Sequence, residues 1–302
     1  MTIRIGASEI GGTFYTQALA LKKCFASVRS LPNVEVVESH LGASIENAHR
    51  LESGDLDFAF ISAPWVAAAK RGTTPFSHSL DLKTVAPMNI GPNFFIVRAD
   101  SPLTKVADLR GRKLAIGLRT SGMTPHADAV LNALRMGPHD LERVYVDFAE
   151  GAEMLVAGGV DAQYQRPIPN RVMTDLCQRV PLRILRFDSD EINAALHAIP
   201  YDRPVLMRKG AIPGLFEDIP QLGVVNLLVA HARCSDDLVN TIVQTIIDNT
   251  VALGALNPLF AGLHDLISMS ASELFSLLQF DDVTLHSGAV RAYANANGLE
   301  AK

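Results

Sequence analysis

The sequence predicts an α/β protein made of two doubly wound lobes that are joined by two crossing strands. Apolar runs of β type alternate with segments whose apolar residues recur at helical spacing, which is typical of layered α/β folds. The same order of elements occurs twice along the chain, so two related lobes are expected. Two long apolar segments lie outside the repeat, and these are expected to connect the lobes.

The first copy of the repeat begins close to the start of the chain. Its expected elements are a strand over 3–5, a glycine-rich loop, a helix over 13–26, a strand over 34–39, a helix over 44–53 and a strand over 56–63. Gly54 is expected to end the second helix, because glycine is the favoured residue directly after a helix. The order of strands and helices, together with the glycine after the second helix, predicts one β-α-β-α-β lobe.

The second copy follows the same order. Its expected elements are a strand over 113–117, a loop, a helix over 124–136, a strand over 144–148, a helix over 152–158 and a strand over 160–165. Gly159 takes the place of Gly54, and Asp161 takes the place of Asp57 before the third strand. The two aspartates are expected to be structural residues at a strand edge.

The connecting segments set the expected domain boundaries. Residues 93–111 read as a strand that leaves the first lobe, and residues 223–239 read as a strand that returns and opens a C-terminal helical region capped by Ser235. Lobe 1 is therefore expected to hold residues 1–93 and 230–302, and lobe 2 residues 94–229. Two crossings form a hinge, and a hinge between lobes predicts a ligand cleft.

Bulk composition excludes several classes of function. The 302 residues are 48% hydrophobic and 20% charged, with a net charge of −5, which argues against a nucleic-acid partner. No apolar run approaches the roughly 20 residues that span a bilayer. Three cysteines without a C-x-x-C pair are expected to be buried small hydrophobes. No metal-binding, dinucleotide or nucleophile motif is found, so neither cofactor nor metal is expected.

The start of the sequence leaves two compartments open. Met1 leads directly into a strand-like segment, without the charged and apolar regions of a secretory leader. The protein is expected in the cytoplasm if Met1 is the native start, and in the periplasm if a leader has been removed.

The loops after the parallel strands form the candidate site, because ligands bind at the carboxyl ends of such strands. The segment Gly6–Thr13 matches a phosphate-binding loop except that Gly12 replaces the lysine, which favours a smaller oxyanion held by backbone amides. Thr124 is expected to cap a helix whose first residue is Pro125. The ligand-binding residues expected from these loops are Ser8, Gly11, Gly12, Thr13, Ser44, Asn47, Trp65, Thr120, Ser121 and Gly122. For each loop taken alone, ordinary helix capping is an equal alternative.

Two arginines are the sharpest candidates for binding a carboxylate. Arg119 and Arg166 each follow a strand that is expected to end at the cleft, where a guanidinium group binds a carboxylate through two parallel hydrogen bonds. The alternative for each is a solvated surface arginine. His126, on the first turn of a helix, is expected to be exposed, with an approach to the ligand as the alternative.

Five segments together resemble the TAXI family, the solute receptors of TRAP-type transporters. These segments are IGASEIGGTFY, LGASIENAHRLESGDLDFAFI, RADSPLTKVADLRGRKLAIG, PGLFEDIPQLGVVNLLVA and LHSGAVRAY, in that order along nearly the whole chain. The resemblance implies a type II periplasmic-binding-protein fold and a small organic anion held between the lobes. Carried over by position, it adds Tyr15 and Ser62 to the expected ligand contacts. Gln165, at the end of the last strand of the second lobe, is expected in the pocket as well.

The chain departs from the pattern of this family at three places in the expected pocket. The third strand runs into Ser62-Ala63-Pro64-Trp65, the last strand of the second lobe runs into Gln165-Arg166-Pro167, and the loop after its first strand begins Leu118-Arg119. Two arginines and a tryptophan thus enter the pocket, which suggests a flat or aromatic ligand with more than one negative group.

Two functions follow from these expectations. The first is a solute receptor that binds a dicarboxylate, amino acid or aromatic acid and presents its closed form to TRAP membrane subunits. The second is a cytosolic enzyme on the same scaffold, such as a decarboxylase or isomerase of an aromatic or dicarboxylic acid, because the sequence starts without a signal peptide. In the enzyme, Arg119 and Arg166 hold carboxylates while His126 or a neighbouring acid moves a proton.

Overall fold

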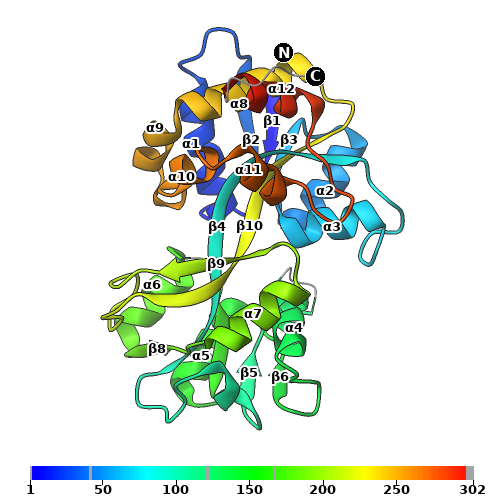
Figure 1. Ribbon diagram of the computed structural model, residues 1–302. Helices are drawn as coiled ribbons and strands as arrows, with labels where there is room; N and C mark the ends of the chain where they lie inside the picture. Colours follow the sequence, from blue (N-terminus) through cyan, green and yellow to red (C-terminus); the bar gives the residue numbers. More distant parts are fainter. Residues whose placement is uncertain (1, 41–42, 120–122, 166–167, 297–302) are drawn as a thin grey trace. The chain divides into compact units, whose positions relative to one another are not determined.

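The computed structural model describes residues 2–40, 43–119, 123–165 and 168–296 (Figure 1). The chain divides into two compact units: unit 1 holds the residues up to Asn89 and from Val225 onward, and unit 2 is Ile90–Val224. Strands β4 (Leu82–Arg98) and β10 (Ile219–His231) each run from one unit into the other. The boundaries expected from the sequence lie a few residues further along these same two strands.

Unit 1 is built on a sheet in the order β2-β1-β3-β10. Strand β1 pairs in parallel with β2 and β3, and β10 runs antiparallel to β3. The elements of this half are β1 (Thr2–Gly6), α1 (Thr13–Phe25), β2 (Asn33–Val37), α2 (Ala43–Ser53), β3 (Phe58–Ser62) and α3 (Ala63–Arg71). The strand–helix alternation predicted for the first copy is confirmed.

Unit 2 repeats this topology. Strand β5 pairs in parallel with β6 and β7, and β4 runs antiparallel to β7. The corresponding elements are β5 (Lys113–Ala115), α4 (Met123–Ala133), β6 (Glu142–Val144), α5 (Phe148–Ala157), β7 (Ala162–Gln165) and α6 (Arg171–Arg179). Each unit thus has a central strand, two parallel neighbours and one antiparallel crossing strand, as the internal repeat predicts.

The two repeat-related aspartates have the same structural role. The Asp57 carboxylate accepts a hydrogen bond from the Arg4 backbone N–H at 2.7 Å, and its own N–H donates to the Arg4 carbonyl at 3.0 Å. Asp161 makes the same pair with Lys113, at 2.8 and 2.9 Å. Each aspartate therefore ties the start of the third strand to the central strand, and the structural role expected for both is confirmed.

The remaining elements lie outside the repeat. In unit 2 these are η1 (Val106–Leu109), β8 (Leu182–Ile184), α7 (Ser189–Ala198) and β9 (Asp202–Met207), with β8 pairing with β4 and β9 with β10. In unit 1 the expected C-terminal helical region is confirmed as α8 (Asp236–Asp248), α9 (Thr250–Leu256), η2 (Pro258–Phe260), α10 (Leu263–Ile267), α11 (Ala271–Leu278) and α12 (Ser287–Ala296). Within the described residues, no helix combines the length and the apolar character that a membrane span requires.

The sheet of unit 2 is buried on both faces. Along β4, Phe95 and Val97 belong to one apolar cluster, which includes residues of α4 and α7. Phe94 and Ile96 belong to a second cluster, with residues of α5 and α6. Because successive side chains of a strand point to opposite faces, a strand covered on both sides reads as a continuous apolar run.

The cysteines differ from the expectation that all three are buried. Cys24 is buried in α1, where the loss of solvation raises the pKa of its thiol. Cys177 and Cys234 are only half-buried, and all three are free thiols. None of the three therefore stabilises the fold through a disulfide bond.

Helices α8 and α12 pack closely in unit 1 (Figure 1). Gly288 lies at their contact. A Cβ atom on Gly288 would lie 2.3 Å from the Asp236 carbonyl oxygen and 2.9 Å from the Val239 Cβ. Those neighbours are a backbone atom and a branched side chain, neither of which can move aside cheaply. This close approach accounts for the glycine in the segment LHSGAVRAY.

A Gly288→Ala variant is expected to lower the free energy of unfolding by about 2 kcal/mol, the typical cost of overpacking a tight contact. Urea denaturation of both proteins measures the difference. Gly262→Ala is the matched control, because a Cβ atom at Gly262 meets no atom within 4 Å and its φ of −91° suits alanine. Equal stabilities for the two variants would contradict the assignment of Gly288 to helix packing.

Candidate functional site

The glycine-rich loop of unit 1 connects β1 to the N-terminus of α1. The Ser8 hydroxyl accepts a hydrogen bond from the Tyr15 N–H at 3.2 Å, so Ser8 caps the helix from the end of the strand. Gly12 is the N-cap residue, and a Cβ atom there would lie 2.3 Å from the Ser8 oxygen. The N–H groups of Thr13 and Phe14, in the first turn, have no intrahelical acceptor and suit an incoming oxygen atom.

A carboxylate holds this loop from the side of β2. Glu38 accepts a hydrogen bond from the Ile10 N–H at 3.0 Å, and the Ile10 side chain is 70% exposed. The negative charge of Glu38 partly offsets the positive charge of the helix dipole at the N-terminus of α1. The loop is therefore less favourable to an anion than the sequence pattern alone indicates.

Hydrogen bonds between Ser44 and Ser62 link the N-termini of the next two helices, α2 and α3. Ser44 lies inside the first turn of α2, which begins at Ala43, one residue before the start expected from the sequence. Its hydroxyl accepts from the Ser62 N–H at 3.2 Å and lies 3.4 Å from the Ser62 hydroxyl. Ser62 is the N-cap residue of α3, so both hydroxyls lie at the carboxyl edge of the sheet.

Asn47 is fully buried and its amide group is occupied by the protein itself. Its Nδ2 donates to the carbonyls of Ala7 at 2.8 Å and Phe60 at 2.9 Å, and its Oδ1 accepts from the Ser39 hydroxyl at 2.6 Å. The side chain thus links the ends of β1 and β3 to the segment after β2. These contacts account for Asn47 without a ligand.

Three buried amide side chains lie in the same unit and were missed by the sequence reasoning. Asn89 Oδ1 accepts from Gln17 Nε2 and from Asn226 Nδ2, both at 3.3 Å. They come from α1, β4 and β10, elements far apart in the sequence. A polar residue in an apolar run was the available signal, and it is a weak one.

In unit 2, Arg119 follows β5 and is exposed. Its guanidinium carbon lies 3.5 Å from the centre of the Tyr145 ring, which follows the neighbouring strand β6. A cation held over an aromatic face keeps its N–H groups at the edge of the stack, where they can reach an acceptor. Thr120, Ser121, Gly122 and Arg166 lie outside the described residues.

The first turn of α4 differs from the sequence expectation. The helix begins at Met123, so Thr124 is not its cap; the Thr124 hydroxyl instead contacts the carbonyls of Leu118 at 2.7 Å and Ile116 at 3.2 Å. A hydroxyl that donates back to the preceding strand fixes the loop rather than the helix terminus. Thr124 therefore holds the segment that carries Arg119.

His126 is buried, so the expectation of an exposed histidine is wrong. Its Nδ1 lies 2.5 Å from the Tyr164 hydroxyl, and its Nε2 lies 2.9 Å from both carboxylate oxygens of Asp202. Burial, and then the charge of Asp202, raise the pKa of Tyr164 well above its ordinary value. With both ring nitrogens engaged and 5% of the residue exposed, His126 joins α4 to β7 and β9 rather than meeting solvent.

The two other residues expected in the pocket are also buried. Trp65 packs its ring against the edge of Phe76, with ring centres 6.4 Å apart, so it belongs to the core of unit 1. Gln165, at the end of β7, donates to Gln163 Oε1 at 2.9 Å, and its own Oε1 has no partner among the described residues. Neither contact is evidence for a flat aromatic ligand.

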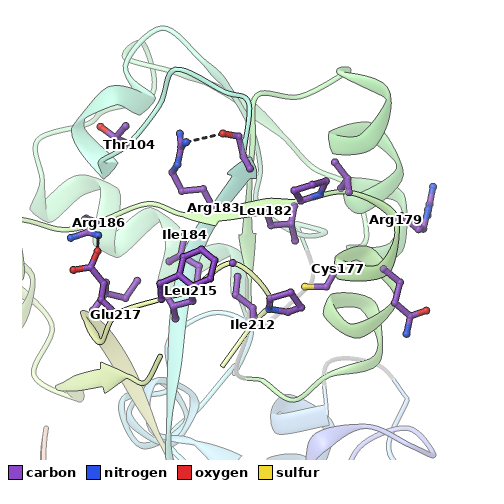
Figure 2. Close-up of a pocket in the computed structure, with 18 residues that line it drawn as sticks. Thr104, Cys177, Arg179, Leu182, Arg183, Ile184, Arg186, Ile212, Leu215 and Glu217 are labelled. Atoms are coloured by element: carbon purple, nitrogen blue, oxygen red, sulfur yellow. Dashed lines mark hydrogen bonds and ion pairs between the residues drawn. The ribbon is translucent and has the colours of Figure 1, made fainter. Parts of the chain in front are cut away.

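A cavity of about 800 Å³ lies in unit 2, away from all of these residues (Figure 2). It is lined by the end of α6, by β8 and by the segment between β9 and β10, with Ile184, Ile212 and Leu215 among its apolar side chains. Its cations are already engaged: Arg186 pairs with Glu217, and Arg183 donates to three backbone carbonyls. No sequence-predicted site residue lines it, and no metal-binding cluster occurs within the described part of the chain.

Solved structures share the fold of this chain. The putative periplasmic sulfonate-binding protein SsuA from Methylobacillus flagellatus aligns over 99% of this chain and 96% of its own, with 14% identity and a TM-score of 0.59. A TctC solute binding protein from Polaromonas aligns over 99% of this chain and 96% of its own, with 16% identity and a TM-score of 0.53. The aliphatic sulphonate binding protein SsuA from Escherichia coli aligns over 97% of this chain and 82% of its own, with 17% identity and a TM-score of 0.51.

These likenesses establish a mixed α/β fold of the periplasmic-binding-protein type, as the two repeated β-α-β-α-β halves and two crossing strands predict. At such low identity they concern the fold and not the ligand. A family model, that of the NMT1-like family, matches residues 5–296, nearly the whole chain. The chain therefore belongs to the NMT1-like family.

Proposed function

We propose that this chain is a solute-binding protein of a transporter, which holds a small organic acid. The TRAP type of transporter is the one that the five-segment resemblance implies. The observation that carries the proposal is Arg119, an exposed guanidinium group at the carboxyl edge of the unit 2 strands. Membership of the NMT1-like family and the shared binding-protein fold support it.

Arg119 has the properties of a carboxylate-binding group. Within the described residues no carboxylate pairs with it, whereas Arg110, Arg143, Arg179 and Arg186 are each paired with an acid. The Tyr145 ring restricts the guanidinium group, so less side-chain freedom is lost when a ligand binds. Its planar edge then donates two parallel hydrogen bonds to one carboxylate.

Recognition of the loaded protein completes the mechanism that we propose. A bound ligand shifts the population of the protein toward the conformation that binds the ligand best. The membrane subunits recognise that conformation and receive the solute.

An Arg119→Gln variant is expected to bind the acid roughly 30-fold more weakly, because a hydrogen bond to a charged group contributes about 2 kcal/mol. Dicarboxylates, amino acids and aromatic acids are first tested by thermal shift, where a true ligand raises the melting temperature as its concentration rises. Titration calorimetry with the best acid then measures the loss. Arg119→Lys is expected to fall between the two proteins, since lysine keeps the charge without the planar edge.

Arg112→Gln is the matched control, because Arg112 is also an exposed arginine of unit 2 that precedes β5. An unchanged affinity in Arg119→Gln would refute the role of this guanidinium group. A panel without any stabilising acid would refute the ligand class. Recovery of the bound acid unaltered after prolonged incubation is expected of a binding protein and not of an enzyme.

A further inference from the structure

A row of five uncharged polar side chains crosses unit 1 at the carboxyl edge of its parallel strands. We call it the amide–hydroxyl row, and its members are Gln17, Asn89, Asn226, Ser62 and Ser44. The Asn89 oxygen accepts from the amides on both sides of it. Asn226 and Ser62 are directly opposite in the β10–β3 ladder, which places their side chains on one face, and the hydroxyls of Ser62 and Ser44 are 3.4 Å apart.

One end of this row has an unsatisfied acceptor. Gln17 is 1% exposed, and its Oε1 has no hydrogen-bond partner among the described residues. Because Oε1 and Nε2 belong to one amide group and Nε2 donates to Asn89, the orphaned oxygen lies at the Gln17 end of the row. A buried acceptor without a donor costs about 1–3 kcal/mol, so a donor from outside the protein is expected to occupy it.

The position of the row distinguishes it from an isolated packing defect. Gln17 is one turn into α1, Ser44 is in the first turn of α2 and Ser62 is the N-cap residue of α3. Three helix N-termini that follow parallel strands thus contribute to it, where ligands of such sheets bind. Gln165 and Gln221 also have an unpartnered Oε1 among the described residues. Their Nε2 groups donate within unit 2, to Gln163 Oε1 and to the Leu185 carbonyl, so neither side chain belongs to this row.

The chemistry of the row selects the group that it binds. No member is charged, so a buried ammonium group or a second carboxylate would lose its hydration without gaining a counter-charge. The carboxylate of Glu38 on the neighbouring loop opposes a second anion further. An O–H or amide N–H group suits both the orphaned oxygen of Gln17 and the hydroxyls of the two serines.

We propose that the amide–hydroxyl row binds a neutral hydrogen-bond donor of the ligand, so that the solute is an organic acid that carries a hydroxyl or amide N–H group. This inference rests on the proposed function, in which the solute is a small organic acid. It replaces the expectation of a ligand with two negative groups by one with an anionic end and a neutral polar end.

Calorimetry with matched acids tests the inference. The pairs are succinate and malate, benzoate and 4-hydroxybenzoate, and glutarate and glutaramate. In the first two pairs the second acid adds a hydroxyl group, and in the third a neutral amide replaces one carboxylate, so each second acid gains a donor. In at least one pair the donor-bearing acid is expected to bind 10-fold or more tightly than its partner, because a site built for a polar group discriminates strongly. Gln17→Met is expected to reduce that ratio to about 2-fold or less by removing the acceptor.

Gln221→Met is the control, a second buried glutamine whose replacement is expected to leave the ratio unchanged. Ser62→Ala tests the serine part of the row by a small truncation, and is expected to lower the same ratio should Gln17→Met fail to fold. If acids bind but no pair discriminates, or if the ratio survives in the folded variant, this inference is wrong and the proposed function stands. If no acid binds the wild-type protein, both are wrong.

Discussion

An Asn47→Leu variant is expected to lose about 4 kcal/mol of the free energy of unfolding, a large value that corresponds to a broken buried hydrogen-bond network. Leucine has a similar volume but cannot donate to the carbonyls of Ala7 and Phe60 or accept from Ser39. Those three buried groups would then lack a partner at the ends of the parallel strands. The loss thus comes from unsatisfied backbone and hydroxyl groups and not from a cavity.

Urea denaturation at neutral pH measures this effect, with the Asn295→Leu variant as control. Asn295 lies on a helix of the same unit but is exposed, so its replacement is expected to change stability by less than about 0.5 kcal/mol. A loss below about 1 kcal/mol in Asn47→Leu would mean that water satisfies the two carbonyls. The Asn47 side chain would then again be a candidate for binding a ligand.

The repeated architecture could be predicted because its signals are local. Helical spacing, glycine after a helix and aspartate before the third strand each act over a few residues, and they recur in the same order in both halves. Asp57 and Asp161 are an example, because they occupy equivalent positions in the two copies of the repeat and make equivalent hydrogen bonds. The segment from β8 to β9 has no counterpart in the first half, and repetition gave no prediction there.

The sequence indicated Arg119 because it lies in the loop after a strand, and its role in binding stays a prediction. Its contact with Tyr145 was not foreseen, because the stacking depends on the pairing of β5 with β6. His126 was expected at the surface, yet its partners lie 38 and 76 residues away along the chain. Burial of a polar side chain depends on such distant partners, and no local pattern reveals them.

Two of these corrections remove reasons to expect an aromatic ligand with more than one negative group. Trp65 packs in the core, and Glu38 places a negative charge on the loop that the sequence pattern assigned to an anion. Within the described residues of unit 2, no carboxylate pairs with Arg119, and within unit 1 the Oε1 atom of Gln17 has no hydrogen-bond partner.

A His126→Phe variant is expected to lose about 3–5 kcal/mol of the free energy of unfolding, since removing one member of a buried pair leaves the other charge uncompensated. Asp202 is 2% exposed, and the His126 ring lies against both of its carboxylate oxygens. Tyr164 would lose the partner of its buried hydroxyl in the same variant. Phenylalanine fills most of the space, so the loss reports on polar contacts rather than packing.

A double-mutant cycle with Asp202→Asn separates the pair from its surroundings. Once Asp202 is neutral, the further change His126→Phe is expected to cost at least about 2 kcal/mol less than in the wild-type background, because no buried charge remains uncompensated. His197→Phe, at an exposed position of α7, controls for the added ring. Additive losses would mean that His126 stabilises the fold through packing and Tyr164 alone. A large coupling would show that a buried histidine–carboxylate pair anchors α4, the helix that follows the Arg119 loop, and would explain why His126 is not available to transfer a proton to a bound ligand.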